Sequence, residues 1–541
     1  MFSFDFLKSK SQVRDIVIIV LAVIIFHWPL FSNGFFQTDD GTLLIIRAGA
    51  FLNSFSDLHI PVRIVENLNY GYGYPIFNFF YPGFFYLTEA FHLLGLGLIV
   101  SIKASILLLA ITGAIGMYLL SQQITNYRLA SISAAFFYLF SPYHILDLYK
   151  RGSFGELFAL AFIPFVTLGI IDYLQKKRKM SLAIAVISTS LVIVGHNTLS
   201  IILLPSAYIF GLLFSGFNFA NIKKILLVFA FGITVPAFFW VPAIFESIYT
   251  VQSKIKIADY TQHFPSLHSF FSDIPFLSPI IRSESNSFPV SIFILLFFVI
   301  ALWIFFKDHH DKPWRIKILV SLFLITLSVF FMTPLSSMFW KYAALDTFIQ
   351  FPWRFLSLTT FAGSILIALT LSYFKKPRKI FLMIPLIIFL YYLPQIKVER
   401  NFNNDDYYLT NDSTTVNQSE LSTVWFDRKI NSRPLNLVTA DSTFEINNLK
   451  QSTKEISFVL NSQKGATVTV NKMYFPHWQL RINGKNHSVE YKSNGLINFS
   501  INKGVSTVEL HFVDTKLRTL ANIITLMSLG SLFILLIKKR L

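Results

Sequence analysis

The sequence predicts an all-α polytopic membrane protein of about twelve transmembrane helices, with a β-rich domain outside the membrane near its C-terminus. Of its 541 residues, 54% are hydrophobic and only 14% are charged, against roughly 25% charged in soluble domains. Apolar runs of about 20 residues, the length that crosses a bilayer, recur along the chain. The 46 Lys and Arg residues outnumber the 29 Asp and Glu residues. The cations lie in short clusters between the apolar runs, which indicates membrane topology and not nucleic-acid binding.

The composition also limits the chemistry that the chain can perform. So few charges exclude an ordinary cytosolic enzyme. Because the sequence contains no cysteine, it has no disulfide framework, no thiolate metal site and no cysteine nucleophile. Any catalysis therefore depends on oxygen and nitrogen groups.

Twelve apolar runs are each long enough to cross a bilayer as a helix. They cover residues 13–31, 104–121, 129–147, 154–174, 180–197, 198–217, 225–245, 289–306, 317–334, 353–374, 380–396 and 519–537. The first run is too long for a signal peptide and lacks a small-residue cleavage site, so we expect it to be retained. Basic clusters next to the runs place both termini in the cytoplasm.

A further apolar segment, residues 76–97, is predicted not to cross. It contains Pro82, Glu89 and His92, and crossing would put the basic run Lys176–Lys179 and every later basic cluster outside. We therefore expect a re-entrant or interfacial helix within a long first outer loop, residues 32–103.

The chain becomes polar after residue 396. Segments Ala466–Val470 and Trp478–Ile482 alternate in polarity, and Asn483-Gly484 follows the second, which is typical of a β-hairpin. We therefore expect a transmembrane domain over 1–396, a sandwich-like β-rich outer domain over 397–518 and a C-terminal membrane anchor over 519–541.

Ionisable residues near membrane depth are costly, so those that gather on one side are functional candidates. The predicted outer face collects Asp39, Asp40, Arg47, Arg63, Glu66, Arg151, Glu156, His196, Asn197, Asp346, Gln350 and Arg354. The cytoplasmic loops hold mostly basic clusters and turn residues. Any chemistry is therefore expected on the outer face.

The sharpest feature is the segment Thr38–Gly41, with two adjacent carboxylates, Asp39 and Asp40. Such a pair suits a general base, and it could also hold a divalent cation. The alternative is a helix cap, which we favour for Asp39. Arg47 follows Asp40 by seven residues and so lies on the same helical face. It could hold a phosphate leaving group, or simply form an ion pair with Asp40.

Three other outer segments carry candidate groups. Arg151 and Glu156 flank a glycine-containing turn, where Arg could clamp phosphate or pair with Glu156. His196 and Asn197 lie at a helical turn, where a cap is the usual role of His, so we give them a supporting role. Arg354 lies at the outer mouth of a span, where snorkelling competes with phosphate binding.

Aromatic residues dominate the stretch Gly71–Pro82, which includes Tyr74 and Tyr81. These rings could stack on sugars, line a lipid groove or anchor the chain at the interface. His263, His268 and Glu284 lack the spacing of a metal site, so we predict no zinc there.

These segments together resemble polytopic glycosyltransferases of the GT-C superfamily, which use polyprenyl-phosphate-linked sugars. The resemblance is closest to the bacterial membrane family around YfhO and its relatives labelled as related to 6-pyruvoyl-tetrahydropterin synthase. The matching segments are Asp40 with Arg47, Asn69–Pro75, Phe80–Pro82, Ser141–Tyr143, Arg151–Glu156, His196-Asn197, Phe351–Phe355, Tyr474–Trp478 and Asn483–Lys485.

The resemblance implies a GT-C-like transmembrane domain whose first outer loop carries the catalytic carboxylate, matched here by Asp40. The tetrahydropterin label implies no pterin chemistry. Relatives often carry His where this chain has Asp39 and Leu44. That difference leaves open the choice of base and the use of a divalent cation, Mg or Mn.

The sequence and the resemblance together predict transfer of a sugar from an undecaprenyl-phosphate-type donor to an outer cell-envelope acceptor, such as a teichoic acid or wall polysaccharide. Asp40, helped by Asp39, would act as base and cause inversion at the anomeric carbon. The remaining site residues divide into phosphate ligands and a supporting pocket. The phosphate ligands are Arg47, Arg151 and Arg354, and the pocket is Glu156, His196, Asn197, Tyr74, Tyr81 and Glu66. The alternatives are a flippase or exporter of lipid-linked glycans and a non-catalytic glycan-binding assembly protein.

Overall fold

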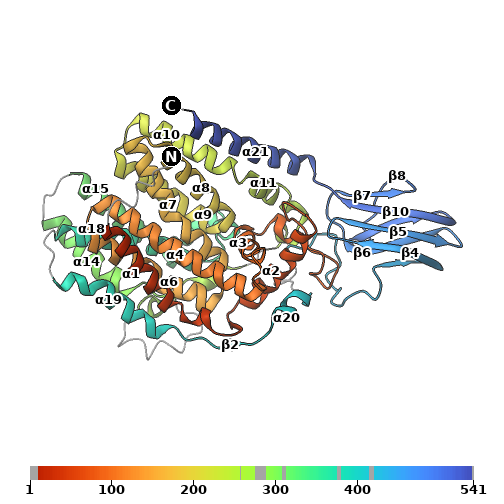
Figure 1. The fold of residues 1–541 in the computed structure, drawn as a ribbon, viewed down its shortest axis with the longest axis horizontal. Helices are drawn as coiled ribbons and strands as arrows, with labels where there is room; N and C mark the ends of the chain where they lie inside the picture. Colours follow the sequence, from red (N-terminus) through yellow and green to blue (C-terminus); the bar gives the residue numbers. More distant parts are fainter. Residues whose placement is uncertain are drawn as a thin grey trace.

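The computed structural model describes residues 10–255, 258–273, 288–307, 312–374, 379–412 and 420–538. Glu284, considered above for a metal site, lies outside these residues. The long helices form one body, and the strands that follow residue 437 project from one end of it (Figure 1).

Helices lie in all twelve predicted apolar runs. The long helices are α1 (Lys10–Phe26), α4 (Leu98–Thr125), α5 (Arg128–Phe140), α7 (Phe154–Lys176), α8 (Lys179–Gly195), α9 (Asn197–Ser215), α10 (Phe219–Thr234), α11 (Ala237–Phe245), α14 (Ile292–Lys307), α15 (Lys312–Phe331), α18 (Leu356–Tyr373), α19 (Lys379–Tyr392) and α21 (Lys516–Ile537). Among the described residues, seven helices are long and apolar enough to cross a membrane, or eight if α10 and α11, bent by 71°, form one span. The count of twelve crossings stays a prediction.

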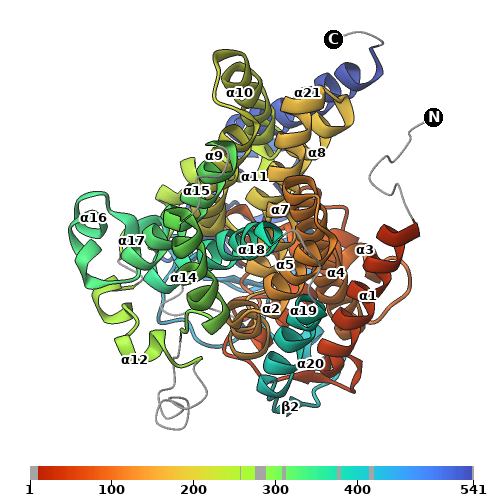
Figure 2. The same cartoon turned by 90° about the vertical axis from the view of Figure 1, so that its left-hand side faces the viewer.

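Burial separates the central helices from the peripheral ones. In α18, 94% of the most apolar window is buried, whereas in α21 the share is 17%. Figure 2 shows α18 in the middle of the bundle, where it packs against α5, α14 and α15. Helix α21 runs back from the strands along α8, α10 and α11. An apolar helix with so few protein neighbours has a surface suited to lipid.

The first outer loop contains β1 (Phe35–Phe36), α2 (Gly41–Ser56) and α3 (Gly83–His92). Helix α3 has ten residues, too few to span a bilayer, in agreement with the predicted interfacial or re-entrant helix. Strand β1 pairs with β2 (Arg400–Asn401), and α20 (Asp405–Thr410) packs on α2. The segment that follows α19 therefore packs against the first outer loop at two places, β1 and α2.

Short helical elements lie between the longer helices. They include α6 (Pro142–Ile145), η3 (Leu146–Arg151), α12 (Leu267–Phe270), α16 (Ser337–Tyr342), α17 (Leu345–Phe348) and η8 (Pro352–Phe355). The element η3 is a π-helix. π-Helices are rare in proteins, and those that occur often lie at functional sites.

Two antiparallel sheets form the β-rich region. Their strands are β3 (Val438–Ala440), β4 (Phe444–Gln451), β5 (Glu455–Ser462), β6 (Ala466–Met473), β7 (Trp478–Ile482), β8 (Lys485–His487), β9 (Leu496–Ile501) and β10 (Gly504–Phe512). The strand orders are β4-β5-β10-β7-β8 and β3-β6-β9. Asn483 and Gly484 have φ of 51° and 76° and connect β7 to β8, as in the predicted two-residue hairpin. The domain boundaries at 396 and 518 stay predictions.

Candidate active site

The acidic segment Thr38–Gly41 leads into α2, and Thr38 caps that helix. The Gly41 amide donates to Thr38 Oγ1 at 2.9 Å. Asp40 occupies the N-cap position, but its carboxylate makes no capping bond. The prediction that Asp39 caps the helix is wrong, because its carboxylate lies 3.4 Å from Lys150 Nζ and is half exposed. Because the Thr38 hydroxyl accepts from the first amide of α2, the Asp40 carboxylate is not used to cap the helix.

The acidic segment lies directly against the end of η3. The amides of Asp39 and Asp40 donate to the carbonyls of Lys150 and Arg151, each at 2.8 Å. Gly152 ends η3 with a φ of +73°, and a Cβ there would lie 2.3 Å from Thr38 Oγ1. Glycine is therefore required at this contact, which fixes Asp40 beside Arg151.

Arg47 lies on α2 in an unusual environment. Its side chain is only 3% exposed, and its guanidinium lies 4.7 Å from the centre of the Phe80 ring. Nε and Nη2 find no hydrogen-bond acceptor within the described part of the chain. The charged neighbours are Asp40 and Glu420, while burial lowers the pKa of Arg47. A buried guanidinium with unused donors is a strong candidate for binding an anion.

Asp40 is a suitable base. The side chain is exposed to solvent, yet the surrounding protein partly desolvates the carboxyl and raises its pKa, while Arg151 and Arg47 oppose that rise. A carboxylate of raised pKa holds a proton more strongly than an ordinary Asp, and it can be reached from outside.

A buried ion network lies behind Asp40. Glu156, on the first turn of α7, is fully buried, and its Oε1 accepts from Arg151 Nη2 at 2.9 Å and Arg354 Nε at 3.3 Å. Glu156 Oε2 accepts from the Tyr143 hydroxyl. Arg151 also bonds to the buried carboxylate of Asp147 through Nη1. Arg151 and Arg354 are therefore both compensated by internal carboxylates.

His196 joins the same network and also caps a helix, as the sequence suggested. Its Nδ1 accepts from the amide of Leu199 at 3.2 Å, at the start of α9. Its Nε2 lies 3.7 Å from Glu156 Oε1, and its ring packs on Tyr81 with centres 4.5 Å apart. His196 thus connects the helix end to the buried carboxylate.

Arg354 is held from several sides. Its Nη1 donates to the Ile349 carbonyl at 2.8 Å and to Gln350 Oε1 at 2.9 Å. The side chain is 8% exposed, so it does not snorkel. The neighbouring Trp353 ring lies 4.1 Å below the Arg151 guanidinium. These contacts make Arg354 part of the scaffold that holds Arg151 and Glu156.

The other expected pocket residues lie at varied distances from this centre. Tyr74 is buried beside Arg47, and its hydroxyl accepts from the Leu421 amide at 3.2 Å. Asn197 is exposed and donates to the Phe79 carbonyl at 3.3 Å. Glu66 faces β6, where its carboxylate lies 3.8 Å from Lys472 Nζ. Glu66 therefore connects the first outer loop to the sheets.

Sequence reasoning missed Asp147 and Glu420 in this cluster, and it named Tyr143 only as part of a matching segment without a role. Asp147 and Tyr143 precede Arg151 and Glu156 by one or more helical turns, and the four-residue spacing of Asp147 and Arg151 is a detectable signal. Glu420 acts electrostatically on Arg47 and Asp40, and burial raises its pKa. It comes from a distant part of the chain, so no local pattern could reveal it.

A divalent cation is poorly matched to the acidic segment. Within the described ranges, no three His, Asp or Glu side chains gather in a group that could hold a metal ion. The Asp39 carboxylate faces Lys150 Nζ, a partner that competes with a cation. We therefore derive no step through a metal.

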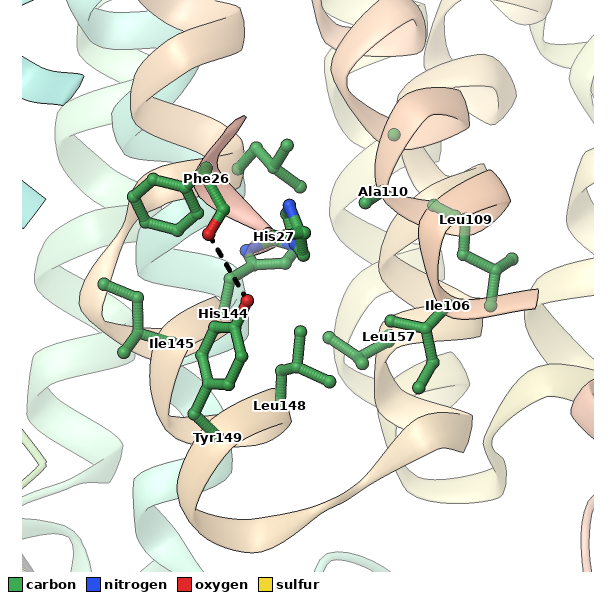
Figure 3. A pocket seen from close by; sticks show the side chains of 13 residues that line it. Phe26, His27, Ile106, Leu109, Ala110, His144, Ile145, Leu148, Tyr149 and Leu157 are labelled. Carbon is green, nitrogen blue, oxygen red and sulfur yellow. Dashed lines mark hydrogen bonds between the residues drawn. The ribbon is translucent and has the colours of Figure 1, made fainter. Parts of the chain in front are cut away.

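Figure 3 shows a small cavity elsewhere in the bundle, between α1, α4 and the α6–η3 segment. His27 and His144 are among its lining residues, and Tyr149 donates its hydroxyl to the Phe26 carbonyl across 3.5 Å. Its volume of about 20 Å³ suits one water molecule and not a substrate. This cavity is therefore not a substrate site, and we take the cluster around Asp40 and Arg47 as the candidate active site because of its contacts and charges.

Comparison with known proteins places this chain in a family. No curated protein sequence matches it. Several solved structures are similar to parts of it, among them the following two. The arabinofuranosyltransferase AftD from Mycobacteria has a TM-score of 0.46 and 15% identity, and the match covers 72% of this chain and 27% of AftD. The oligosaccharyltransferase of Archaeoglobus fulgidus in its apo form has a TM-score of 0.42 and 13% identity, with 76% of this chain and 57% of that chain covered.

The family comparison is more direct. A family model described as a 6-pyruvoyl-tetrahydropterin synthase related domain, membrane protein, matches residues 77–398. That range includes Arg151, Glu156, His196 and Arg354, whereas Asp40 precedes it. The match confirms the predicted relation to membrane proteins labelled as related to 6-pyruvoyl-tetrahydropterin synthase. Because it covers more than half of the sequence, the chain belongs to the 6-pyruvoyl-tetrahydropterin synthase related family of integral membrane proteins.

Proposed function

We propose that this protein is a membrane glycosyltransferase. It moves a sugar from a polyprenyl-phosphate donor, of the undecaprenyl type, to a hydroxyl of a cell-envelope glycan outside the membrane. One observation carries the proposal: the buried guanidinium of Arg47, with two unused donors, lies in the electrostatic field of the exposed base Asp40.

Arg47 is the phosphate ligand in this proposal. Nε and Nη2 form the side-on fork of a guanidinium, which matches two phosphate oxygens. Leaving buried N–H groups without acceptors costs roughly 1–3 kcal/mol each, and a bound phosphate removes that cost. Arg151 and Arg354 already bond to Glu156. They therefore act as scaffold, which narrows the three phosphate ligands expected from the sequence to one.

Asp40 is the base that activates the acceptor. Its carboxylate takes the proton of the acceptor hydroxyl as that oxygen bonds to the anomeric carbon. The bond from this carbon to the phosphate oxygen breaks, and the polyprenyl phosphate leaves with its charge against Arg47. Attack opposite the leaving group inverts the anomeric carbon, through an oxocarbenium-like transition state. Asp39 is paired with Lys150 and is secondary in this reaction.

The experiment is a transfer assay with purified protein in nanodiscs. Radiolabelled polyprenyl-phosphate sugars are supplied with cell-envelope acceptors, including teichoic acid and wall polysaccharide. We compare wild type with Asp40→Asn and Arg47→Gln. Glu445→Gln is the control, because Glu445 is exposed on β4, outside the candidate site. The expected result is transfer by wild type and control, donor binding without transfer by Asp40→Asn, and weakened donor binding by Arg47→Gln.

Two outcomes overturn the proposal. Transfer by Asp40→Asn at the wild-type rate removes Asp40 as the base. If wild type consumes no donor but moves a labelled lipid-linked glycan across proteoliposome membranes, the protein is a flippase and not a transferase.

A further inference from the structure

Four aromatic side chains gather where the β-rich region meets the loop after α11. We name Tyr249, Trp425, Tyr474 and Tyr491 the outer aromatic cluster. Tyr474 and Tyr491 stack with ring centres 3.8 Å apart and planes 6° apart. Trp425 packs edge-on to Tyr491 at 4.8 Å, and Tyr249 lies 5.8 Å from Trp425 on a tilted plane. Each ring is only partly buried, so the cluster offers aromatic surface to solvent.

The backbone holds these rings rigidly. Gly495 has a φ of +74°, and a Cβ there would lie 2.3 Å from Phe426 Cα and 2.5 Å from the Trp425 carbonyl carbon. The Tyr474 amide donates to the Gly495 carbonyl, and the Gly495 amide to the Tyr491 carbonyl, each at 2.8 Å. The turn after Tyr491 is thus pressed against Trp425. A pre-arranged aromatic surface loses little side-chain entropy when a ligand binds.

A short backbone ladder connects the cluster to the candidate active site. The Gln252 amide donates to the Glu420 carbonyl at 2.7 Å, and the Val424 amide donates to the Tyr249 carbonyl at 2.9 Å. Glu420 acts on Arg47 and Asp40 at one end of this ladder, and Trp425 lies at the other. A fully extended chain reaches at most about 3.6 Å per residue, and this segment turns, so the five steps from Glu420 to Trp425 span less than roughly 18 Å. The cluster and the candidate active site therefore lie within reach of one polymer chain.

The rims of the rings are polar. Burial, followed by the neighbouring Tyr491 and Tyr249 hydroxyls, raises the pKa of Tyr474 to about 12. The Tyr474 hydroxyl therefore stays protonated near neutral pH. Flat apolar faces with hydroxyl edges match a sugar ring, which has a C–H face and hydroxyls at its rim. A lipid tail would use the faces but not the hydroxyls.

We propose that the outer aromatic cluster is a binding subsite for the acceptor, that the acceptor is a carbohydrate chain, and that the cluster holds sugar units remote from the attacked hydroxyl. This assignment adds an acceptor subsite to the proposed transferase function. It rests on that function only for the statement that the bound carbohydrate is the acceptor and runs from the cluster towards Asp40. The binding itself requires no catalysis.

The test measures carbohydrate binding by the full-length protein in nanodiscs without any donor. The probe is the total polysaccharide extracted from the envelope of the source cells, and retention is read by sugar analysis. The variants Trp425→Leu and Tyr491→Leu keep apolar volume but remove a ring. Tyr407→Leu is the control, since Tyr407 is 42% exposed on α20, outside the cluster. Thermal unfolding verifies that each variant is folded.

We expect wild type, Tyr407→Leu and Asp40→Asn to retain polysaccharide, and the two cluster variants to bind about tenfold more weakly. Where transfer is measurable, the cluster variants raise the acceptor KM for long chains and leave kcat nearly unchanged. Retention without transfer by wild type supports the subsite while the transferase function fails.

Three results overturn the proposal. Wild type retains no polysaccharide, or folded cluster variants retain as much as wild type. In the third, the tryptophan fluorescence that Trp425→Leu removes is quenched by brominated phospholipid in the nanodisc and unaffected by polysaccharide, which makes the cluster a membrane-interface anchor.

Discussion

Arg47 and Arg354 are buried, Arg151 is nearly so, and the three arginines have different partners. Arg151 bonds to Asp147 and Glu156, and Arg354 bonds to Glu156 and two groups of its own loop. Arg47 keeps two donors without acceptors in the part of the chain that the structure describes. Removing one partner of a buried ion pair leaves the other charge buried without compensation, which destabilises the fold. Removing the Arg47 guanidinium, whose Nε and Nη2 have no hydrogen-bond acceptor among the described residues, instead removes the cost of burying those groups. The three side chains should therefore respond differently to mutation.

Arg47→Gln is expected to weaken donor binding and to leave stability equal or higher. The loss of one charge-assisted phosphate contact costs about 1.5–3 kcal/mol, or roughly ten- to hundredfold in affinity. Arg354→Gln is expected to destabilise the fold by about 3–5 kcal/mol, because Glu156 loses a cation. Donor binding and thermal unfolding of both variants separate the two roles. Equal destabilisation by both would show that Arg47 is structural.

The pH dependence of transfer should report Asp40. Burial raises the pKa of its carboxyl, and the base must be deprotonated, so the rate should fall with decreasing pH through a value above about 3.9, the ordinary pKa of Asp. Arg47 favours the ionised carboxylate, so Arg47→Gln should move this acidic limb to higher pH, and Arg47→Lys should restore it. The profile of kcat/KM from pH 4 upward checks the shift, and an unmoved limb assigns the titration to another group.

At the scale of elements, the site depends on one contact between η3 and the segment before α2. Two backbone hydrogen bonds and the close approach of Gly152 hold this contact. A π-helical turn inserts extra residues into the helical path, and here it presents Lys150 and Arg151 to the acidic segment. The position of Asp40 is therefore a property of the contact and not of α2 alone.

Gly152→Ala is expected to abolish most transfer. Its φ of +73° strains any side chain, and the new Cβ would overlap Thr38 Oγ1. Gly216→Ala is the matched control, because Gly216 has a φ of +94° but no atom within 4 Å of the added Cβ. Both variants place a Cβ on a residue of positive φ and so share the same backbone destabilisation. Only Gly152→Ala also displaces the segment that holds Asp40. Similar activity in the two variants would mean that the η3 contact does not matter.

The sequence predicted the positions of the helices and the hairpin well, and the tertiary contacts between side chains less well. Asp40, Arg47, Arg151, Glu156 and His196 were found because polar groups stand out against apolar runs. The ion pairs were only partly predictable. The sequence left open whether Arg151 pairs with Glu156 or with a phosphate, and the approach of Glu420 requires the return of the chain after the bundle. Such contacts depend on tertiary packing, which local patterns do not encode.

At the scale of the molecule, charge is arranged by side. The candidate site, the first outer loop and the sheets lie together, while the basic ends of α7 and α8 lie far from them (Figure 1). The excess of cations at one side predicts that this side is cytoplasmic. The sheets and Asp40 would then face outward, with both termini inside.

Cysteine labelling can test this orientation, because the natural chain contains no cysteine. Lys485→Cys lies in the exposed hairpin between β7 and β8, and Gln175→Cys at the exposed end of α7. A membrane-impermeant maleimide added to intact cells should label Lys485→Cys. Gln175→Cys should react only after the cells are opened. The reverse pattern would invert the topology and move the candidate site into the cytoplasm.

The pairing of β1 with β2 also has a consequence for biosynthesis. Asp40 follows β1 closely, but its partner strand is made only after residue 399, and Arg63 awaits Asp514, which comes 451 residues later. At about 5–20 residues per second, that interval is roughly 20 to 90 seconds. The first outer loop must stay soluble and unassembled while the following helices insert. A nascent chain that ends before residue 399 would carry Asp40, Arg47, Arg151 and Arg354 but lack β2 and Asp514, which hold the first outer loop. The candidate site therefore becomes active only after residue 514 has been synthesised.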